Sequence, residues 1–320
     1  MRPFTYTAAR TVDEALGHPA TYLAGGTTLV DLMKLEVLTP EHVVDITALP
    51  LRGVRADARG LTIGAMERMS DVAGHDLVAG PYPLLAEALR QSASPQIRNM
   101  ATIGGNLLQR TRCGYFRDPL TPCNKREPGS GCPAVQGHNR GHAILGTSEA
   151  CVATHASDLA VALTALDAGL TLRGAGGTRT VRLADFYRLP GGTPHLENGL
   201  RPGELVTAVT VPALPWARRS AYVKVRDRQS YEFALVSAAV AVNVTGGVIR
   251  AARVAAGGVG TRPWRLPSVE RELEGRPMNQ ATFEAAVRHA ADGARPLAHN
   301  RFKAALLRRT IVRALVRLAG

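Results

Sequence analysis

Four cysteines are the residues whose type and spacing point most directly to chemistry. They are Cys113, Cys123, Cys132 and Cys151, so every cysteine of this 320-residue chain falls within one stretch of 39 residues. Their pattern, C-x9-C-x8-C-x18-C, contains none of the C-x2-C pairs that zinc ribbons use. Four thiolates on a loop suit an iron–sulfur cluster, which cysteines hold at varied spacings. A zinc site, disulfides and unligated buried thiols stay open as alternatives.

The neighbourhood of the cysteines is rich in positive charge, which would stabilise an anionic thiolate-bound cluster. The basic residues are Arg110, Arg112, Arg117, Lys125 and Arg126, opposed by Asp118 and Glu127. Three histidines flank the cysteines: His138, His142 and His155. Because four cysteines already complete the ligand set, we expect these histidines to be hydrated or to hydrogen-bond the sulfurs rather than to bind iron.

Two glycine pairs have the chemistry of a phosphate site, because glycine lets the backbone approach an anion closely. The first pair lies in LAGGTTLV, where Gly25 and Gly26 precede Thr27 and Thr28. The second lies in ATIGGNLLQ, which supplies Thr102, Gly104, Gly105 and Asn106. Two such loops could clamp a pyrophosphate from both sides. A simple turn is the alternative for each pair.

Other nucleotide motifs are excluded. None of the four lysines follows a glycine, so the chain has no P-loop, and Gly174 and Gly176 are followed by Arg179 where a Rossmann fingerprint needs glycine. The net charge of +13 is carried mostly by arginine, and residues 246–320 hold a net +9. Since no aromatic residues interleave these arginines, we expect a solvated face or a docking surface for an acidic partner rather than a nucleic-acid groove.

Periodicity predicts an α+β chain. Thr11 and Glu14 form a capping box for a short helix ending near residue 17, and strand and helix patterns then alternate to residue 91, favouring a mixed sheet covered by helices. Residues 95–148 show no period and are predicted to be a long functional loop. A helix follows at 157–169, and strands at 170–174, 178–183 and 204–212.

Prolines near residue 215 favour a boundary there, so we predict an N-terminal domain of residues 1–216 with an insertion at about 107–152, and a C-terminal domain of residues 217–320. Antiparallel strands are expected at 221–226, 233–244 and 248–260, followed by three helices. The last helix carries a core-facing stripe of Leu307, Ile311, Leu315 and Leu318. No apolar run is long enough to span a membrane, and no signal peptide is recognisable at the start of the chain.

These motifs, in this order, resemble the flavin-binding subunits of the molybdenum hydroxylases, the xanthine dehydrogenase family. The resemblance rests on AGGTTLVDLMK, ATIGGNLLQ, SDLAVAL and VRDRQSYEFALVSAAVAV, which span nearly the whole chain. The insertion QRTRCGYFRDPLTPCNKREPGSGC resembles that of the periplasmic aldehyde oxidoreductase flavin subunits, which carry an additional [4Fe-4S] cluster.

The resemblance implies a two-subdomain FAD-binding fold followed by a C-terminal flavoprotein domain. It also implies the FAD-binding residues: Thr21, Tyr22, Leu23, Ala24, Gly25, Gly26, Thr27, Thr28 and Leu29 in the first loop, Thr102, Gly105 and Asn106 in the second, Asp158 near the ribose and adenine, and Lys224 near the flavin. Asp158 as a helix cap and Lys224 as a solvated strand residue are the structural alternatives. Cys113, Cys123, Cys132 and Cys151 become the cluster ligands.

The implied function is electron transfer in a molybdenum-dependent aldehyde oxidoreductase. A large molybdenum-cofactor subunit and a small [2Fe-2S] subunit would be the partners, and an external acceptor would take the electrons. The compartment would be the periplasm, by co-export with a partner, or the cytoplasm. A zinc-binding assembly or nucleic-acid module and a stand-alone FAD oxidoreductase are the alternatives.

Overall fold

A computed structural model describes residues 1–17 and 20–320. The chain begins with a three-stranded parallel sheet of order β1-β3-β2, made of β1 (Thr5–Ala8), β2 (Thr21–Leu23) and β3 (His42–Asp45). Helices α1 (Val12–Leu16) and α2 (Leu29–Lys34) follow β1 and β2. The predicted capping box is confirmed, because Thr11 accepts a hydrogen bond from the Glu14 amide and the Glu14 carboxylate accepts one from the Thr11 amide.

The next strands form a separate, antiparallel sheet of order β4-β5-β8-β6-β7. Its strands are β4 (Val54–Asp57), β5 (Gly60–Gly64), β6 (Gly169–Gly174), β7 (Gly177–Arg182) and β8 (Leu205–Pro212). The expectation of one mixed sheet was therefore wrong. β5 pairs with β8, more than 140 positions later, and a local strand pattern carries no information about so distant a partner.

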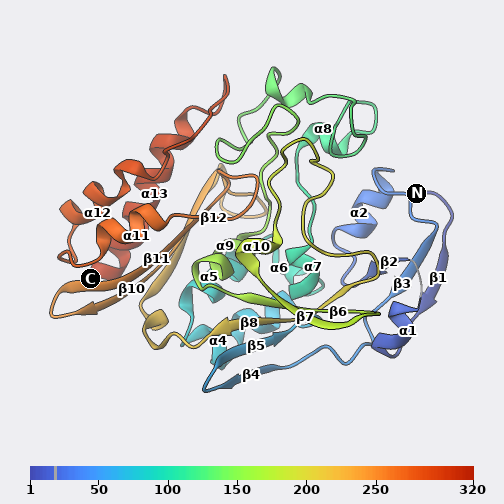
Figure 1. The fold of residues 1–320 in the computed structure, drawn as a ribbon, viewed down its shortest axis with the longest axis horizontal. Helices are drawn as coiled ribbons and strands as arrows, with labels where there is room; N and C mark the ends of the chain where they lie inside the picture. Colours follow the sequence, from blue (N-terminus) through green and yellow to red (C-terminus); the bar gives the residue numbers. More distant parts are fainter. Residues whose placement is uncertain (18–19) are drawn as a thin grey trace.

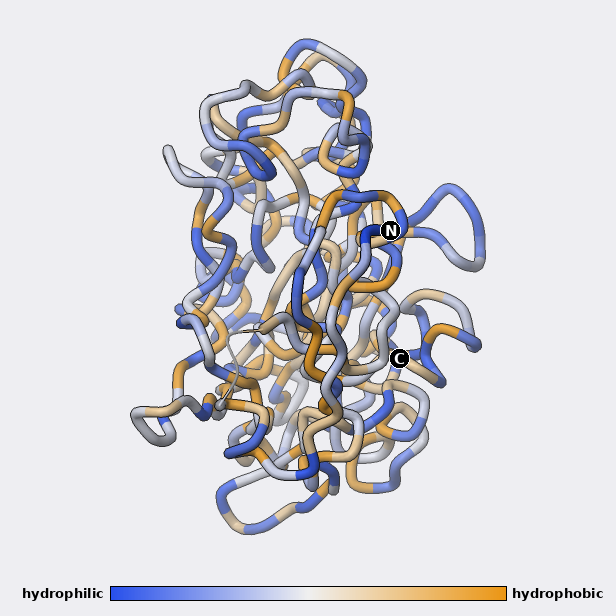
Figure 2. The backbone as a smooth tube through the Cα atoms, turned by 90° about the vertical axis from the view of Figure 1, so that its right-hand side faces the viewer, coloured by the Kyte–Doolittle hydropathy of each residue, from blue (hydrophilic) through white to orange (hydrophobic). Residues whose placement is uncertain are grey.

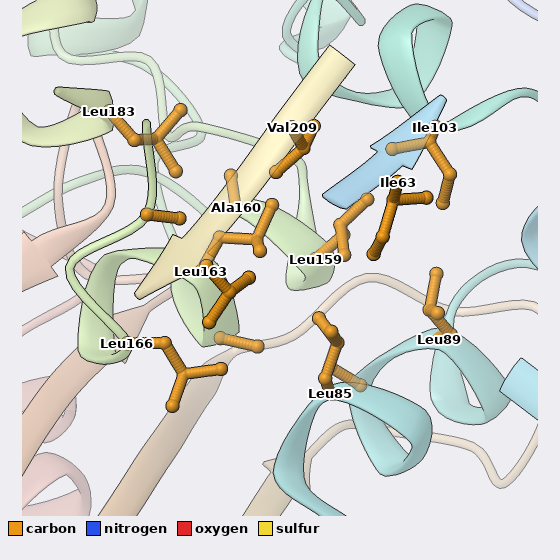
Figure 3. Close-up of a cluster of buried hydrophobic side chains, with 14 of the residues drawn as sticks. Ile63, Leu85, Leu89, Ile103, Leu159, Ala160, Leu163, Leu166, Leu183 and Val209 are labelled. Atoms are coloured by element: carbon orange, nitrogen blue, oxygen red, sulfur yellow. The ribbon is translucent and has the colours of Figure 1, made fainter. Parts of the chain in front are cut away.

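Helix α9 (Asp158–Ala165) lies at the centre of the molecule. All eight of its residues are buried, as expected for a helix that is apolar on every side. It packs on α5 (Pro83–Gln91) and on two strands of the C-terminal sheet, β10 (Val236–Thr245) and β11 (Val248–Gly257). Figure 3 shows Leu159 and Leu163 of α9 beside Leu85 of α5 and Val209 of β8.

The segment predicted to be a loop contains short helices instead. These are α6 (Pro95–Arg98), α7 (Ile103–Leu107), α8 (Gly114–Arg117) and the 3₁₀ turn η1 (Pro133–Val135), and the second glycine pair lies inside α7. Each is five residues or fewer, which is too short to show a helical period in the sequence. Helices α3 (Met69–Gly74), α4 (Asp76–Ala79) and α10 (Leu183–Phe186) complete this half.

The C-terminal sheet is antiparallel, with order β12-β11-β10-β9. It comprises β9 (Ser220–Val225), β10, β11 and β12 (Trp264–Arg265), and helices α11 (Pro267–Leu273), α12 (Gln280–Ala286) and α13 (Phe302–Ala319) cover one face (Figure 1). The turns η2 (Pro215–Arg218) and η3 (Val287–His289) flank these elements, and the predicted domain boundary falls in η2. In the predicted stripe of α13, Leu307, Ile311 and Leu315 are fully buried.

Close packing of α9 on β11 depends on Gly257. A Cβ there would lie 2.6 Å from Cγ2 of Val161 and 2.5 Å from Oγ of Ser237. Any side chain at this position would push the two halves of the molecule apart. Figure 2 shows hydrophilic residues on the projecting loops and hydrophobic ones concentrated within the body. No helix in the described ranges is long and apolar enough to cross a membrane.

The fully buried Lys303 on α13 ties the C-terminal helices to the cysteine segment, which we define as residues 109–155. Its Nζ donates hydrogen bonds to the carbonyl oxygens of Gly141, His142 and Gly258 at 3.0, 2.9 and 2.6 Å. The side chain therefore donates to three backbone acceptors, and two of them belong to the buried residues His142 and Gly258.

We predict that Lys303→Met lowers the free energy of unfolding by about 1–3 kcal/mol, because it leaves the buried carbonyl group of Gly258 without its lysine donor. Denaturant unfolding measures this loss. The control is Arg313→Met, an exposed position on the same helix, which should change stability little. Equal stability of the two variants would contradict the assigned role of Lys303.

Candidate functional site

The first glycine loop, residues 24–28, connects β2 to α2 and touches a second chain segment. A Cβ on Gly25 would lie 1.9 Å from the carbonyl oxygen of Met100, so only glycine permits this approach. Gly26 has φ +71°, a conformation that favours glycine. The loop is thereby held against the residues that lead into α7.

The second glycine pair opens α7, whose N-cap is Thr102. The Thr102 hydroxyl accepts a hydrogen bond from the Gly105 amide at 3.2 Å. The Gly104 amide donates to the carbonyl oxygen of Ala65 at 2.8 Å. Asn106 is fixed by Ser157, whose hydroxyl donates to its Oδ1 at 2.6 Å. These contacts anchor the start of α7 opposite the first glycine loop.

Two adjoining cavities lie between these loops, with volumes of about 230 and 430 Å³. Their linings share Thr27, Thr28 and Gly105, so an elongated ligand can run from one cavity to the other across both glycine loops. The predicted residues in one or both linings are Thr21, Tyr22, Ala24, Gly25, Gly26, Thr27, Thr28, Leu29, Thr102, Gly105, Asn106 and Asp158. Leu23 and Lys224 lie outside both linings.

Asp158 and Lys224 form a buried ion pair at 2.7 Å, with only 1% of the lysine side chain exposed. Asp158 also accepts hydrogen bonds from the hydroxyls of Tyr222, at 2.6 Å, and Ser92, at 3.3 Å. Burial, together with the nearby carboxylate, raises the pKa of Tyr222 well above its ordinary value, so this hydroxyl stays a donor. Lys224 is thus neither solvated nor in contact with the cavity, and Ser157 rather than Asp158 caps α9.

Sequence reasoning missed Asp31, and it placed Arg112 and Arg117 beside the cysteines without placing them at this cavity. Asp31 on α2 binds Arg117 at 2.8 and 3.0 Å and Arg112 at 2.8 Å, and all three line the larger cavity. The hydrogen bonds from Arg117 are the main reason that the pKa of Asp31 is lowered. Only the local excess of arginine was visible in the sequence, because the carboxylate lies more than 80 positions away.

The segment between β9 and β10 covers the larger cavity. Arg228, Tyr231, Glu232 and Phe233 line it, and the Arg112 guanidinium lies 5.4 Å from the centre of the Phe233 ring. Tyr231 has φ +53° and is largely exposed. This segment supplies the aromatic surface that the glycine loops lack.

The four predicted cysteine ligands line one further cavity. Cys123 and Cys151 are buried, Cys113 and Cys132 are half-buried, and all four thiols are free. Cys113 and Cys123 pack with Phe116 of α8 against Leu32 of α2. The fold therefore gathers thiols that are up to 38 positions apart in the sequence and seats them beside the first glycine loop.

Backbone amides are directed at three of the thiol sulfurs. Those of Tyr115 and Phe116 face Cys113, and the amide of Ala153 donates to Cys151 Sγ at 3.5 Å. The amides facing Cys132 are those of Ala134, Val135 and Val152. Burial nevertheless raises the pKa of Cys113 to about 11 and also raises those of Cys132 and Cys151. In the described ranges, no group of three or more His, Cys, Asp or Glu side chains could hold a metal ion.

The positive charges predicted around the cysteines are partly neutralised by a residue outside the segment. Glu197 pairs with Lys125 at 2.8 Å and also with Arg110. Lys125 Nζ donates to the Pro194 carbonyl oxygen at 2.9 Å as well. These contacts hold the cysteine segment to the loop before β8.

The three histidines have different surroundings. His138 is exposed and stacks on His299, with ring centres 6.2 Å apart, and His155 meets Tyr187 edge-on at 4.4 Å. His142 is buried, and its Nε2 lies 3.2 Å from Cys113 Sγ. The expected contact between a histidine and a cysteine sulfur is thus made by His142, which the sequence could not single out from the other two.

We predict that Lys224→Met destabilises the chain by about 3–5 kcal/mol, because it leaves the Asp158 carboxylate buried without its cation. Thermal or denaturant unfolding gives the loss. Adding Asp158→Asn to this variant should recover much of it, whereas Lys34→Met, at an exposed position, should have little effect. A double variant no more stable than Lys224→Met would refute a charge-pair role.

Comparisons with known proteins agree with this architecture. Residues 1–214 match the FAD binding domain in molybdopterin dehydrogenase, and residues 220–319 match the CO dehydrogenase flavoprotein C-terminal domain. The chain is 48% identical to the aldehyde oxidoreductase FAD-binding subunit PaoB of Escherichia coli, over 98% of each chain. It is 32% identical to the glyceraldehyde dehydrogenase medium chain of Sulfolobus acidocaldarius, over 86% of this chain and 83% of that one.

A solved structure shares the fold. The reconstituted CO dehydrogenase from Oligotropha carboxidovorans superposes with a TM-score of 0.77 at 25% identity, covering 99% of this chain and 98% of the other. The resemblance inferred from the order of the sequence motifs is thus confirmed. The chain belongs to the FAD-binding subunits of the molybdenum hydroxylase family and is part of an oxidoreductase.

Proposed function

We propose that this chain holds FAD in the two adjoining cavities and a [4Fe-4S] cluster at its four cysteines, and that it transfers electrons within a molybdenum-dependent aldehyde oxidoreductase. The similarity to the E. coli aldehyde oxidoreductase subunit supports the substrate class. The observation that carries the cluster is the convergence of all four thiols on one cavity.

The cavity residues fit FAD. Both glycine loops contribute residues shared by the two cavities, and a pyrophosphate at this point would accept hydrogen bonds from their backbone amides. Arg110 lines the smaller cavity, and Arg112 and Arg117 line the larger. Positive charge therefore lies on both sides of the point where the two cavities meet. Asp158 supplies a carboxylate that can accept a hydroxyl donor from the ribose.

The cysteine cavity brings together four thiols, which is the ligand set of a [4Fe-4S] cluster. Iron and sulfide atoms separate the thiolates of a cubane, so its ligands stand farther apart than those of one metal ion. Amides directed at the sulfurs of Cys113, Cys132 and Cys151 favour their thiolate forms. The buried, largely apolar surroundings exclude water from the site. The absence of any C-x2-C pair in the sequence favours iron over zinc.

The two sites adjoin one another in this chain. Cys113 lies only seven positions after Asn106 in the sequence, which limits the distance between their Cα atoms to about 25 Å. Arg112, beside Cys113, lines the larger FAD cavity, and a third cavity of about 350 Å³ is lined by both Cys113 and Asp158. FAD exchanges electrons singly or in pairs, and an iron–sulfur cluster exchanges them singly. The chain's own task is to hold the two groups at short range.

We further propose that partners supply the remaining chemistry. A large molybdenum-cofactor subunit would oxidise the aldehyde, a small [2Fe-2S] subunit would deliver the electrons, and an external acceptor would remove them. The arginine-rich C-terminal half, with Arg308, Arg309 and Arg313 exposed on α13, offers a surface for an acidic partner. The compartment is then that of the assembled complex, either the periplasm after export with a partner or the cytoplasm.

We predict that the protein, purified anaerobically with its partners, contains about one FAD per copy of this chain and about four irons beyond those that the [2Fe-2S] subunit holds. Cys123→Ser should lose the cluster iron of this chain and retain FAD, because Cys123 lines neither of the two FAD cavities. Iron, acid-labile sulfide and flavin assays measure this. Zinc without iron would favour the zinc-binding alternative, and aldehyde turnover by this chain alone would favour a stand-alone oxidoreductase.

The reciprocal variant is Gly25→Ala. Its Cβ would collide with the Met100 carbonyl oxygen, so the glycine loops must move apart, and we expect FAD affinity to fall at least about tenfold while the cluster remains. Titration of the flavin-free protein with FAD measures the change. Gly74→Ala is the matched control, because a Cβ there meets nothing within 4 Å. Unchanged affinity would exclude this loop from the FAD site.

A further inference from the structure

His142 is the polar side chain whose placement beside the cysteines is not explained by cluster ligation. Its Nε2 lies 3.2 Å from Cys113 Sγ, a hydrogen-bonding distance for sulfur. His142 and Cys113 both line the third cavity, which also reaches Asp158 at the FAD site. The contact therefore lies on the part of the cysteine segment that faces the flavin cavities.

The surroundings of the imidazole determine which nitrogen carries the proton. Nδ1 is buried and has no hydrogen-bond partner within the described part of the chain. A proton on Nδ1 would therefore be an unsatisfied buried donor, whereas a proton on Nε2 points at a sulfur that accepts it. The favoured neutral tautomer is the one that donates an N–H···S hydrogen bond to Cys113.

The backbone of His142 is clamped by the C-terminal domain. Its carbonyl oxygen accepts hydrogen bonds from Asn300 Nδ2 at 3.2 Å and from Lys303 Nζ at 2.9 Å. Tyr115 lies beside the imidazole, with ring centres 6.3 Å apart. The ring thus has little freedom to turn away from the thiol. Residues almost 160 positions downstream therefore fix the donor that faces Cys113.

We propose that His142 is a positioning residue that donates a hydrogen bond to the Cys113 thiolate and thereby makes the cluster easier to reduce. This inference rests on the proposed [4Fe-4S] site. A donor withdraws negative charge from the ligand sulfur, and the reduced cluster, being the more negative form, benefits more than the oxidised one. The hydrogen bond therefore raises the reduction potential of the cluster.

Two variants of His142 distinguish the effect of its hydrogen-bond donor from the effect of its side-chain packing. His142→Leu fills the space without a donor, and His142→Gln retains an N–H group of similar reach. In the complete enzyme, EPR-monitored redox titration should show a more negative cluster potential for His142→Leu and a potential near that of the wild type for His142→Gln. The matched control is His138→Leu, an exposed histidine of the same segment, which should leave the potential unchanged.

Iron content and the FAD potential, measured on the same samples, separate the possible failures. A wild-type enzyme with no cluster in this chain overturns the proposed function and this inference with it. Full iron in every variant, with an unchanged cluster potential in His142→Leu, overturns the inference alone. An equal shift of the FAD potential would also overturn it, because a general structural change would then be the cause.

A measurement on the wild type covers the case in which His142→Leu does not assemble a cluster. With ¹⁵N-labelled histidine, pulsed EPR of the reduced cluster should detect a weak coupling to an imidazole nitrogen. His142→Gln should remove this coupling, whereas His138→Leu should retain it. Absence of any imidazole coupling in the wild type overturns the inference.

Discussion

The buried carboxylate of Asp158 is the charge on which the packing of the two halves depends. It opens α9, the central helix, and accepts hydrogen bonds from Ser92 of the N-terminal half and from Tyr222 of the C-terminal sheet. Lys224 supplies the countercharge. A carboxylate buried among apolar residues is tolerated only when it is paired and hydrogen-bonded, so these partners must come together for the interface to close. The same carboxylate forms part of the cavity wall, which couples the shape of the FAD site to the docking of the two halves.

The cysteine segment has little regular structure and is held from outside. Asp31 on α2 binds Arg112 and Arg117, Glu197 binds Lys125, and Lys303 on α13 binds the carbonyl oxygens of Gly141 and His142. A segment without its own hydrophobic core can present four thiols in one place only if such contacts offset the entropy of ordering it. Each anchor comes from a different part of the fold. The placement of the thiols therefore depends on contacts with several distant parts of the molecule.

One arrangement places a dinucleotide site and a thiol site on the same short stretch of chain. Helix α7 begins where the two proposed FAD cavities meet, and Cys113 lies six residues after the end of this helix. Arg112 belongs to both regions, since it binds Asp31 beside the glycine loop and lines the cavity shared with Cys113. Under the proposed function this arrangement would hold two redox groups close together, and electron transfer needs such proximity more than chemical assistance from side chains.

The sequence by itself determined which chemical groups are present and where the local turns lie. Glycine pairs and apolar periods identified the glycine loops and most strands and helices, because each of these signals lies within a few consecutive residues, and the four cysteines stood out by their clustering. The short helices α6 to α8 and the division into separate sheets could not be found in this way. Tertiary structure alone decided that Lys224 pairs with Asp158, that Asp31 binds two arginines and that His142 meets Cys113. These contacts join positions 29 to 86 residues apart, and a side chain's charge does not reveal which distant partner the folded chain will bring to it.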